Sequence, residues 1–349
     1  MAGHRSVVTK SRHPLAWSLG HTLGHTLGHT LGHTLAHSAR RRRRPAAPGS
    51  YAFVTTGLAG SDSVSMVDTR SGRTIATIPV GDRPDAVVVS PDGHRAYVAN
   101  FYDGSVSVID SAREVVVDTI VLPVSEDYAF AADLALSSDG ARLFVADSAS
   151  DSLVVIDTGT HEVVANVPVG RGPEAVVASS RKVYVANRDD ATLSVVDVDS
   201  LAVSRTVAVP AEPLDLALVE HTGMLYVASA AAGRVAVLDT TTDRIRESIP
   251  MPRASWLAAA PEGTRLYVGH LGGVSVLDLA SHDVPVTLAL QGCGTAPRVA
   301  VGPDGRVYVG YSSASGATLD VFDAGLQRRF DTRSLTGLVT GVTVGTLAA

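Results

Sequence analysis

The chain has 349 residues, of which 45 % are hydrophobic and 5 % aromatic, and it carries a formal charge of −6. A chain of this size can bury roughly three quarters of its unfolded surface, so it is long enough for a large core filled mainly by Val, Ala and Leu. The single cysteine, Cys293, excludes an internal disulfide, and no apolar run reaches the roughly 18 residues that a membrane-spanning helix needs.

The first fifty residues differ from the rest in charge. They hold eight Lys and Arg residues and no Asp or Glu, whereas the remainder, with 21 basic and 35 acidic residues, carries a formal charge of −14. An acidic body lacks the clustered positive potential that binding to a nucleic-acid backbone needs. We therefore expect no specific nucleic-acid binding by the folded part of the chain.

The segment GHTLGHTLGHTLGHTLAH places a histidine at every fourth residue, from His21 to His37. On a helix this row would drift by about 40° per step, and each glycine costs about 1 kcal/mol relative to alanine, so a metal-binding stripe is disfavoured. We interpret residues 1–49 as a low-complexity, disordered segment that binds metal at most incidentally, with a physiological metal role as the alternative. The run Arg40 to Arg44 indicates a solvated basic linker or a tether to an anionic surface. The histidines also interrupt the apolar stretch of a secretory signal.

From Tyr51 onward the chain repeats with a period of about 40 residues. An aromatic residue followed by valine recurs at intervals of 44, 47, 40, 42, 41 and 41 residues, and each is followed by a run that ends in aspartate, such as SVSVID. The aromatic residues are Phe53, Tyr97, Phe144, Tyr184, Tyr226, Tyr267 and Tyr308, and the aspartates are Asp68, Asp110, Asp157, Asp197, Asp239, Asp278 and Asp323. Seven copies of both landmarks predict seven structural units.

Each unit divides into four short strands. In the second unit they read DAVVVS, RAYVAN, GSVSVID and EVVVDTI. Asp-Gly pairs between first and second strands tolerate the positive φ of a tight hairpin, and the aspartate that closes the third strand can accept bonds from nearby main-chain amides. The apolar first strands, for example AVVVS, predict burial on both faces. Four-stranded repeats of this length, seven times over, predict an all-β, seven-bladed β-propeller with antiparallel blades.

The two ends of the repeat are complementary. The first unit begins with its second strand, YAFVTT, whereas the last unit has four strands of its own and is followed by LTGLVTGVTVGTLAA. We predict that residues near 338–346 pair with the blade of residues 51–78 and close the ring, because closure removes exposed sheet edges. The chain then divides into an N-terminal segment, 1–49, and a propeller, 50–349, which we expect to be a monomer.

The motifs AYVAN, GSVSVID and SPDG resemble the YVTN-type repeat of the YncE-like and surface-layer-associated β-propellers. The resemblance spans residues 51–349, and the signature Tyr-Val-Thr-Asn is matched best by YVAN at 97–100 and 184–187. It implies a seven-bladed propeller that is often exported, to the periplasm or the exterior; the cytoplasm is the alternative, since no signal peptide is evident. Related rings serve as binding scaffolds, lactonases, lyases and dehydrogenase subunits, so the fold does not select a function.

Candidate site residues lie on the loops that lead into the first strands and on those that join the second strands to the third. Polar and aromatic loop residues on a rigid ring are natural binding candidates. We predict a ligand-binding rim formed by Arg83, Asp85, Tyr128, Arg171, Glu174, Arg253, Trp256, His270 and Arg298, flanked by Asp133, Glu212, Asp215, Phe101, Tyr102, Arg188 and Tyr311. The alternative is that these charges pair with one another across a wet tunnel. An anionic or carboxylate-bearing ligand is favoured by four of the arginines, Arg83, Arg171, Arg253 and Arg298.

Metal and haem chemistry have little support in the sequence. Four of the five propeller histidines fall on turns at the opposite face (His94, His161, His221 and His282), which leaves His270 at the rim. A metal or haem site needs several convergent ligands, so we predict no metal and no cofactor. No nucleophile elbow, phosphate loop or paired-cysteine motif is present, and the setting of Cys293, QGCGTAP, favours a buried or loop thiol over a nucleophile.

The rim is compatible with two functions. The first is a non-enzymatic binding propeller that presents its charged rim to a protein, a peptide or an anionic small molecule. The second is a lactonase-like hydrolase or a lyase in which Glu174, Glu212 or Asp215 acts as general base and arginines stabilise an oxyanion. Because no coherent catalytic set is visible, we favour the first.

Overall fold

The computed structural model describes residues 49–57, 62–123, 129–314 and 316–347. The histidine repeat, the arginine run and Tyr128 lie outside these ranges. Within them the one helical element is a 3-10 turn, η1 (Glu220–Thr222), and no helix there is long and apolar enough to cross a membrane.

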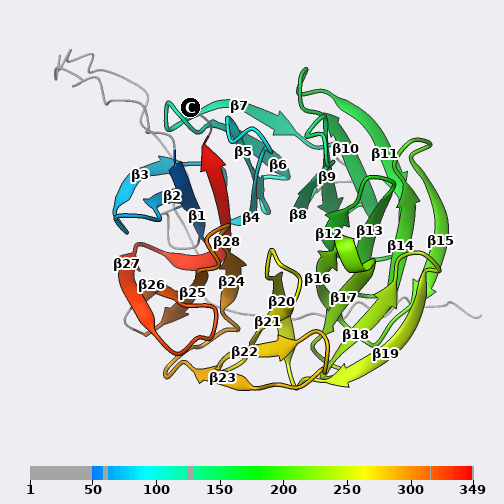
Figure 1. Cartoon of the computed structure of the whole chain (residues 1–349). Helices are drawn as coiled ribbons and strands as arrows, with labels where there is room; N and C mark the ends of the chain where they lie inside the picture. Colours follow the sequence, from blue (N-terminus) through cyan, green and yellow to red (C-terminus); the bar gives the residue numbers. More distant parts are fainter. Residues whose placement is uncertain (1–48, 58–61, 124–128, 315, 348–349) are drawn as a thin grey trace, which may run out of the picture. The chain divides into compact units, whose positions relative to one another are not determined.

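The strands of the described chain form seven four-stranded antiparallel sheets, which surround a central axis as the blades of a propeller (Figure 1). From the innermost strand outward, blade 1 contains β28 (Leu338–Leu347), β1 (Gly49–Gly57), β2 (Ser63–Asp68) and β3 (Thr74–Pro79); blade 2 contains β4 (Pro84–Val89), β5 (Arg95–Asn100), β6 (Ser105–Asp110) and β7 (Val115–Val121); blade 3 contains β8 (Ala131–Leu136), β9 (Arg142–Asp147), β10 (Ser152–Asp157) and β11 (Val163–Pro168); and blade 4 contains β12 (Pro173–Ala178), β13 (Lys182–Asn187), β14 (Thr192–Asp197) and β15 (Ala202–Ala208). Blade 5 contains β16 (Pro213–Val219), β17 (Met224–Ser229), β18 (Arg234–Asp239) and β19 (Arg244–Pro250); blade 6 contains β20 (Ala254–Ala259), β21 (Arg265–His270), β22 (Gly273–Asp278) and β23 (Val286–Ala289); and blade 7 contains β24 (Arg298–Val301), β25 (Val307–Ser313), β26 (Gly316–Phe322) and β27 (Arg329–Leu335). The predicted fold class is confirmed.

The ring closes as the sequence predicts. β28 pairs antiparallel with β1, from Gly49 opposite Leu347 to Gly57 opposite Leu338, and so supplies the inner strand that the first unit lacks. Figure 1 shows these two strands, from opposite ends of the chain, side by side in one blade. Closure leaves blade 1 with the same four strands as the other six blades.

Burial follows the position of a strand in its blade. The second and third strands are enclosed on both faces, as in β5 and β6, because neighbouring blades pack over them. The repeated aromatic residues lie here, and Phe53, Phe144 and Tyr184 are fully buried. The inner strands differ from the expectation of burial on both faces, since several residues of β4 and β12 are half-buried where the strands border the channel.

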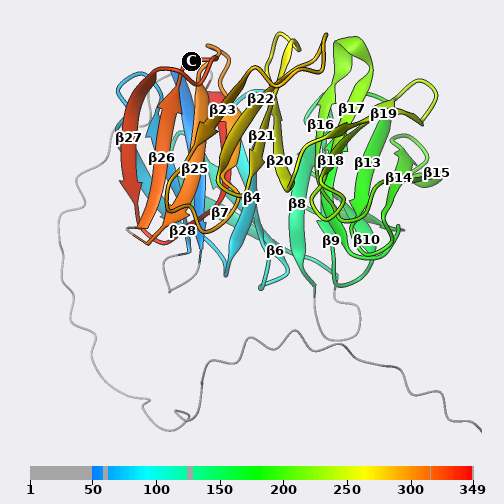
Figure 2. The same cartoon turned by 90° about the horizontal axis from the view of Figure 1, so that it is seen from below.

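The turns carry the chemistry that the sequence indicates. Gly93 and Gly140, from the SPDG and SSDG turns, have φ of 72° and 71°, a region in which glycine meets no steric cost. After the third strand of blade 1, Asp68 Oδ1 accepts hydrogen bonds from the main-chain amides of Arg70 and Ser71 at 2.8 and 2.9 Å. Figure 2 shows that the strands run between the two faces of the ring, so the turns gather at these faces.

Candidate functional site

The inner strands of five blades begin with a β-bulge. In β4, β8, β12, β16 and β20 the pairing with the second strand shifts after the first residue. A bulge inserts an unpaired residue and re-aims the side chains beside it. Consecutive residues such as Glu174 and Ala175 therefore both border the same cavity in the channel.

One residue from each of the seven inner strands lies at a common level of the channel. The pairing registers bring together Ala86, Asp133, Ala175, Asp215, Trp256, Arg298 and Gly341. All seven line one cavity of about 170 Å³. The three small residues leave space between the larger side chains. We call these seven residues the channel level.

A second cavity, with a larger volume of about 520 Å³, adjoins the first at the end of the channel where the inner strands begin. We call this second cavity the mouth cavity. Both cavities are lined by Asp85, Leu214, Trp256 and Arg298, so they adjoin across these four residues. The wall of the mouth cavity includes Gly292, Gly294, Ala296, Leu338 and Val339. It is therefore made largely of small and apolar residues, unlike the charged channel level.

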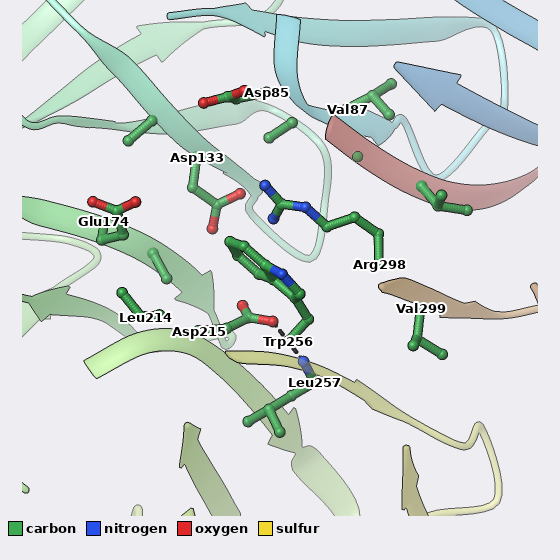
Figure 3. A pocket seen from close by; sticks show the side chains of 15 residues that line it. Asp85, Val87, Asp133, Glu174, Leu214, Asp215, Trp256, Leu257, Arg298 and Val299 are labelled. Atoms are coloured by element: carbon green, nitrogen blue, oxygen red, sulfur yellow. Dashed lines mark hydrogen bonds between the residues drawn. The ribbon is translucent and has the colours of Figure 1, made fainter. Parts of the chain in front are cut away.

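Arg298 extends into the channel from β24 (Figure 3). Its guanidinium carbon lies 3.2 Å from the centroid of the Trp256 ring, a cation–π contact. Burial lowers the pKa of Arg298, while the charges of four carboxylates, first that of Asp85, oppose this shift. In the part of the chain that the structure describes, no side chain forms a hydrogen bond or an ion pair with this guanidinium.

Asp133 and Asp215 are held in the channel by main-chain amides. Asp133 Oδ2 accepts a hydrogen bond of 2.9 Å from Val176 of the next blade. Asp215 accepts one of 2.7 Å from Leu257 of the next blade through Oδ2, and one of 2.8 Å from Leu216 through Oδ1. Burial raises the pKa of Asp133 to about 6, and burial together with the charge of Asp133 raises the pKa of Asp215 to about 7.

Asp85 and Glu174 occupy bulge positions and already have cationic partners. Asp85 lies 3.4 Å from Arg83 Nε, and Glu174 accepts a bond of 3.0 Å from Arg188. Burial raises the pKa of both carboxyl groups, and these arginines oppose the shift. Figure 3 shows the two carboxylates on one side of the cavity, with Arg298 reaching toward Asp133 from the other.

The remaining predicted rim residues lie away from the two cavities. Arg171 is exposed and pairs with Asp190 at 2.6 Å. Glu212 and Arg253 are exposed turn residues with φ of 54° and 57°, just before β16 and β20. His270 Nε2 lies 2.9 Å from Ser275 Oγ, at the end of β21. The structure therefore brings together Arg83, Asp85, Glu174, Asp215, Trp256 and Arg298, and leaves Arg171, Glu212, Arg253 and His270 outside their cavities.

An aromatic cluster stands beside the mouth. Phe101 stacks on Phe130 with ring centroids 4.8 Å apart, and Tyr102 packs edge-on against Phe101. The guanidinium of Arg83 lies 4.4 Å from the Phe101 centroid. The predicted placement of Arg83 with Phe101 and Tyr102 at the rim thus corresponds to direct contacts between them.

Sequence reasoning missed the small residues of the channel level and the wall of the mouth cavity. Alignment of the inner strands would have placed Ala86, Ala175 and Gly341 opposite the charged residues. The mouth wall had a weaker signal, the glycine-rich run QGCGTAP at 291–297. In it Cys293 is partly buried, and its thiol lies 2.8 Å from the Thr295 carbonyl oxygen.

The carboxylates of the channel do not form a metal-binding group. Across residues 49–57, 62–123, 129–314 and 316–347, no three His, Cys, Asp or Glu side chains are arranged so that they could hold a metal ion. The N-terminal histidine repeat lies outside those residues.

The blades, their closure and the polar channel define the class of this protein, a seven-bladed β-propeller. Residues 46–180, which contain strands β1 to β12, match the model of the family described as YNCE-like beta-propeller. The match confirms the resemblance of the repeat motifs to the YncE-like propellers. No curated protein matches the sequence.

Among solved structures, the chain is similar to a chain of Kuenenia stuttgartiensis hydrazine synthase. The two share 20 % sequence identity with a TM-score of 0.65, over 74 % of this chain and 89 % of that one. At this level of identity the likeness concerns the propeller fold.

Proposed function

We propose that this chain is a non-enzymatic binding propeller that receives its ligand through the channel mouth. The observation that supports this function most directly is the pair of adjoining cavities at one end of the channel. Their shared residues combine an aromatic ring, Trp256, with charged groups, Asp85 and Arg298. A concave site with a few convergent polar groups is the usual form of a ligand pocket.

The charges of the rim favour a small molecule over a broad anionic partner. Arg171 pairs with Asp190, Arg83 lies beside Asp85, and Arg298 is surrounded by carboxylates. These arginines do not form one continuous cationic surface. A ligand small enough to enter the cavities can instead contact the charged groups within them.

A test of the binding function compares the wild-type protein with a variant whose mouth is blocked. Leu338 is 40 % exposed and lines the mouth cavity, so Leu338→Trp should fill the mouth without altering a charged group. Val164→Trp, at a 53 % exposed position of the outer strand β11, is the matched control. We expect native mass spectrometry after incubation with a deproteinised cell extract to reveal a retained small molecule in the wild type and the control. Equal retention by Leu338→Trp would contradict the proposal.

A lactonase-like or lyase-like enzyme is the second candidate, favoured by one observation. Asp215 has a pKa of about 7 and lies in a cavity with Arg298, as a general base beside an oxyanion partner would. The amides of Leu216 and Leu257 nevertheless hold both of its oxygens in place. Asp215→Asn should abolish turnover of a lactone substrate if this candidate is right, and a lactonase activity that survives the substitution would exclude Asp215 as the base.

A further inference from the structure

The guanidinium of Arg298 needs a partner that the described chain does not supply. Arginine presents five N–H donors, and a partly buried guanidinium that has no acceptor in the protein leaves those donors available to a ligand. Arg298 is stacked on Trp256 and points into the channel cavity, but no described side chain accepts a bond from it. Its position indicates an acceptor, such as a carboxylate, that enters from outside.

The opposite side of the same cavity offers acceptors. Each ionised carboxylate has about four lone-pair sites. Two of those on Asp215 are used by main-chain amides, as is at least one on Asp133. The lone pairs that remain border the cavity, where Ala175 separates the two aspartates along the channel level. They suit a donor-rich cationic group such as an ammonium.

We propose that the channel binds a zwitterionic α-amino acid, with its carboxylate on Arg298, its ammonium group on Asp133 and Asp215, and its side chain in the mouth cavity. The inference rests on the proposed binding function and names the class of its ligand. A simple anion would meet four carboxylates, whereas a simple cation would leave Arg298 without an acceptor. A molecule that carries an ammonium group and a carboxylate on one carbon atom satisfies both sides of the cavity.

The two cavities also differ in polarity, as the charged backbone groups and the side chain of such an amino acid require. The cavity of about 170 Å³ at the channel level holds the charged groups, and the mouth cavity of about 520 Å³ has a small, apolar wall that includes Ala296, Leu338 and Val339. An apolar side chain of moderate size would therefore be buried at the mouth, which favours valine, leucine, methionine or phenylalanine over polar amino acids.

Calorimetric titration with L-valine, L-leucine, L-methionine and L-phenylalanine at pH 7.5 tests the proposal. For L-leucine the matched probes are 3-methylbutylamine, which lacks the carboxylate, and 4-methylpentanoate, which lacks the ammonium group. We expect at least one amino acid to bind with one site per chain, and both leucine analogues to bind at least tenfold more weakly than leucine. An amine or an acid that binds as tightly as its parent amino acid would overturn the proposal, as would a lack of binding by all four amino acids.

Three variants locate the site. Arg298→Gln and Leu338→Trp should each raise the Kd at least tenfold, whereas Arg171→Gln, at an exposed position outside both cavities, should change it less than twofold. Leu338→Trp keeps the test decisive if Arg298→Gln does not fold, because it leaves every charged group in place. Amino-acid binding that is unchanged by Leu338→Trp would overturn the assignment to this channel.

The failure of this inference can be distinguished from failure of the binding function itself. If the wild type retains another small molecule from a cell extract, and Leu338→Trp does not, the channel binds a ligand of a different class and the amino-acid assignment is wrong. If the wild type retains nothing from the extract and binds no amino acid, both proposals fail together.

Discussion

The carboxylate of Asp215 in blade 5 accepts a hydrogen bond of 2.7 Å from the main-chain amide of Leu257 in blade 6. Asp133 and Val176 repeat this relationship between blades 3 and 4, at 2.9 Å. These contacts join the inner strands of neighbouring blades at the channel level, where no sheet hydrogen bonds connect them. The same side chains therefore serve the stability of the ring and line its cavity.

Removal of this link should destabilise the protein. Asp215→Ala leaves the amides of Leu216 and Leu257 without their acceptor, and a buried donor without a partner costs about 1–3 kcal/mol. We expect the free energy of unfolding, measured by urea titration at pH 5, where the native carboxyl group is protonated, to fall by about 2 kcal/mol. Asp199→Ala, at an exposed turn, is the control and should change it by less than about 0.5 kcal/mol. Equal stabilities of the two variants would argue that the link contributes nothing.

The raised pKa values of Asp133 and Asp215 predict a pH dependence of stability. With folded-state values of about 6 and about 7, against about 3.9 in an unfolded chain, the native state binds more protons between these limits. Stability should therefore decrease as the pH rises from 5 to 8, by about 4 kcal/mol for the two groups together. The measurement is the urea midpoint at both pH values.

The double variant Asp133→Asn with Asp215→Asn should lose most of this pH dependence, because neither amide titrates and only Asp85 and Glu174 keep a raised pKa in the cavity. Carboxyl groups on the turns, such as Asp157, do not contribute in this range, since hydrogen bonds from main-chain amides lower their pKa. A variant that keeps the slope of the wild type between pH 5 and 8 would assign the effect to other groups.

Ring closure by β28 should be essential for cooperative folding. A chain that ends at residue 335 lacks this strand and exposes both the edge of β1 and the inner faces of the adjacent blades. We expect its thermal unfolding to be broad and its midpoint to fall by more than 10 °C, as followed by circular dichroism. Addition of a synthetic peptide of residues 336–349 should restore part of the loss by pairing with β1. Cooperative melting of the shortened chain at the wild-type temperature would contradict the role of closure.

A partly buried ion pair connects blades 4 and 5 at the face opposite the mouth cavity. Lys182 Nζ donates bonds of 2.9 and 2.7 Å to the two carboxylate oxygens of Asp243, and the Tyr184 hydroxyl donates one of 2.9 Å to the same group. Asp243→Ala leaves both donors without this acceptor, so we expect a loss of about 2–4 kcal/mol in the free energy of unfolding. A double-mutant cycle with Lys182→Met measures the coupling, and a value near zero would show that the pair does not act as a unit.

The repeat made the architecture predictable from the sequence, whereas the site was predictable in part. Aromatic spacing, Asp-Gly turns and the surplus strand at residues 338–346 each depend on local sequence, and the structure confirms all three. Which residues form the channel level depends on the register in which each inner strand pairs with its second strand. A bulge after Pro173 and at equivalent positions decides which of two neighbouring residues pairs with the second strand, and such a shift leaves no simple trace in composition.

The sequence pattern likewise could not predict which arginines form ion pairs. Arg171 and Arg298 look alike in the loops before or at the start of inner strands, yet Arg171 pairs with Asp190 at the surface and Arg298 enters the channel. The difference follows from register, because Arg171 lies two residues before β12 and four before the channel-level residue Ala175, whereas Arg298 is itself the channel-level residue of β24. Only the strand boundaries, which sequence patterns place to within a few residues, separate the two cases.

The pairing of β28 with β1 also determines when, during synthesis of the chain, the central channel becomes complete. A ribosome adds about 5–20 residues per second, so the roughly 280 residues between the two strands emerge over about 14–56 seconds. The six blades that use consecutive strands can assemble in order during that time. The first blade stays incomplete until its inner strand, β28, has been synthesised. Gly341, the last member of the channel level, arrives with β28. A nascent chain therefore has no complete channel to offer a ligand, and binding would report that translation of the whole ring is finished.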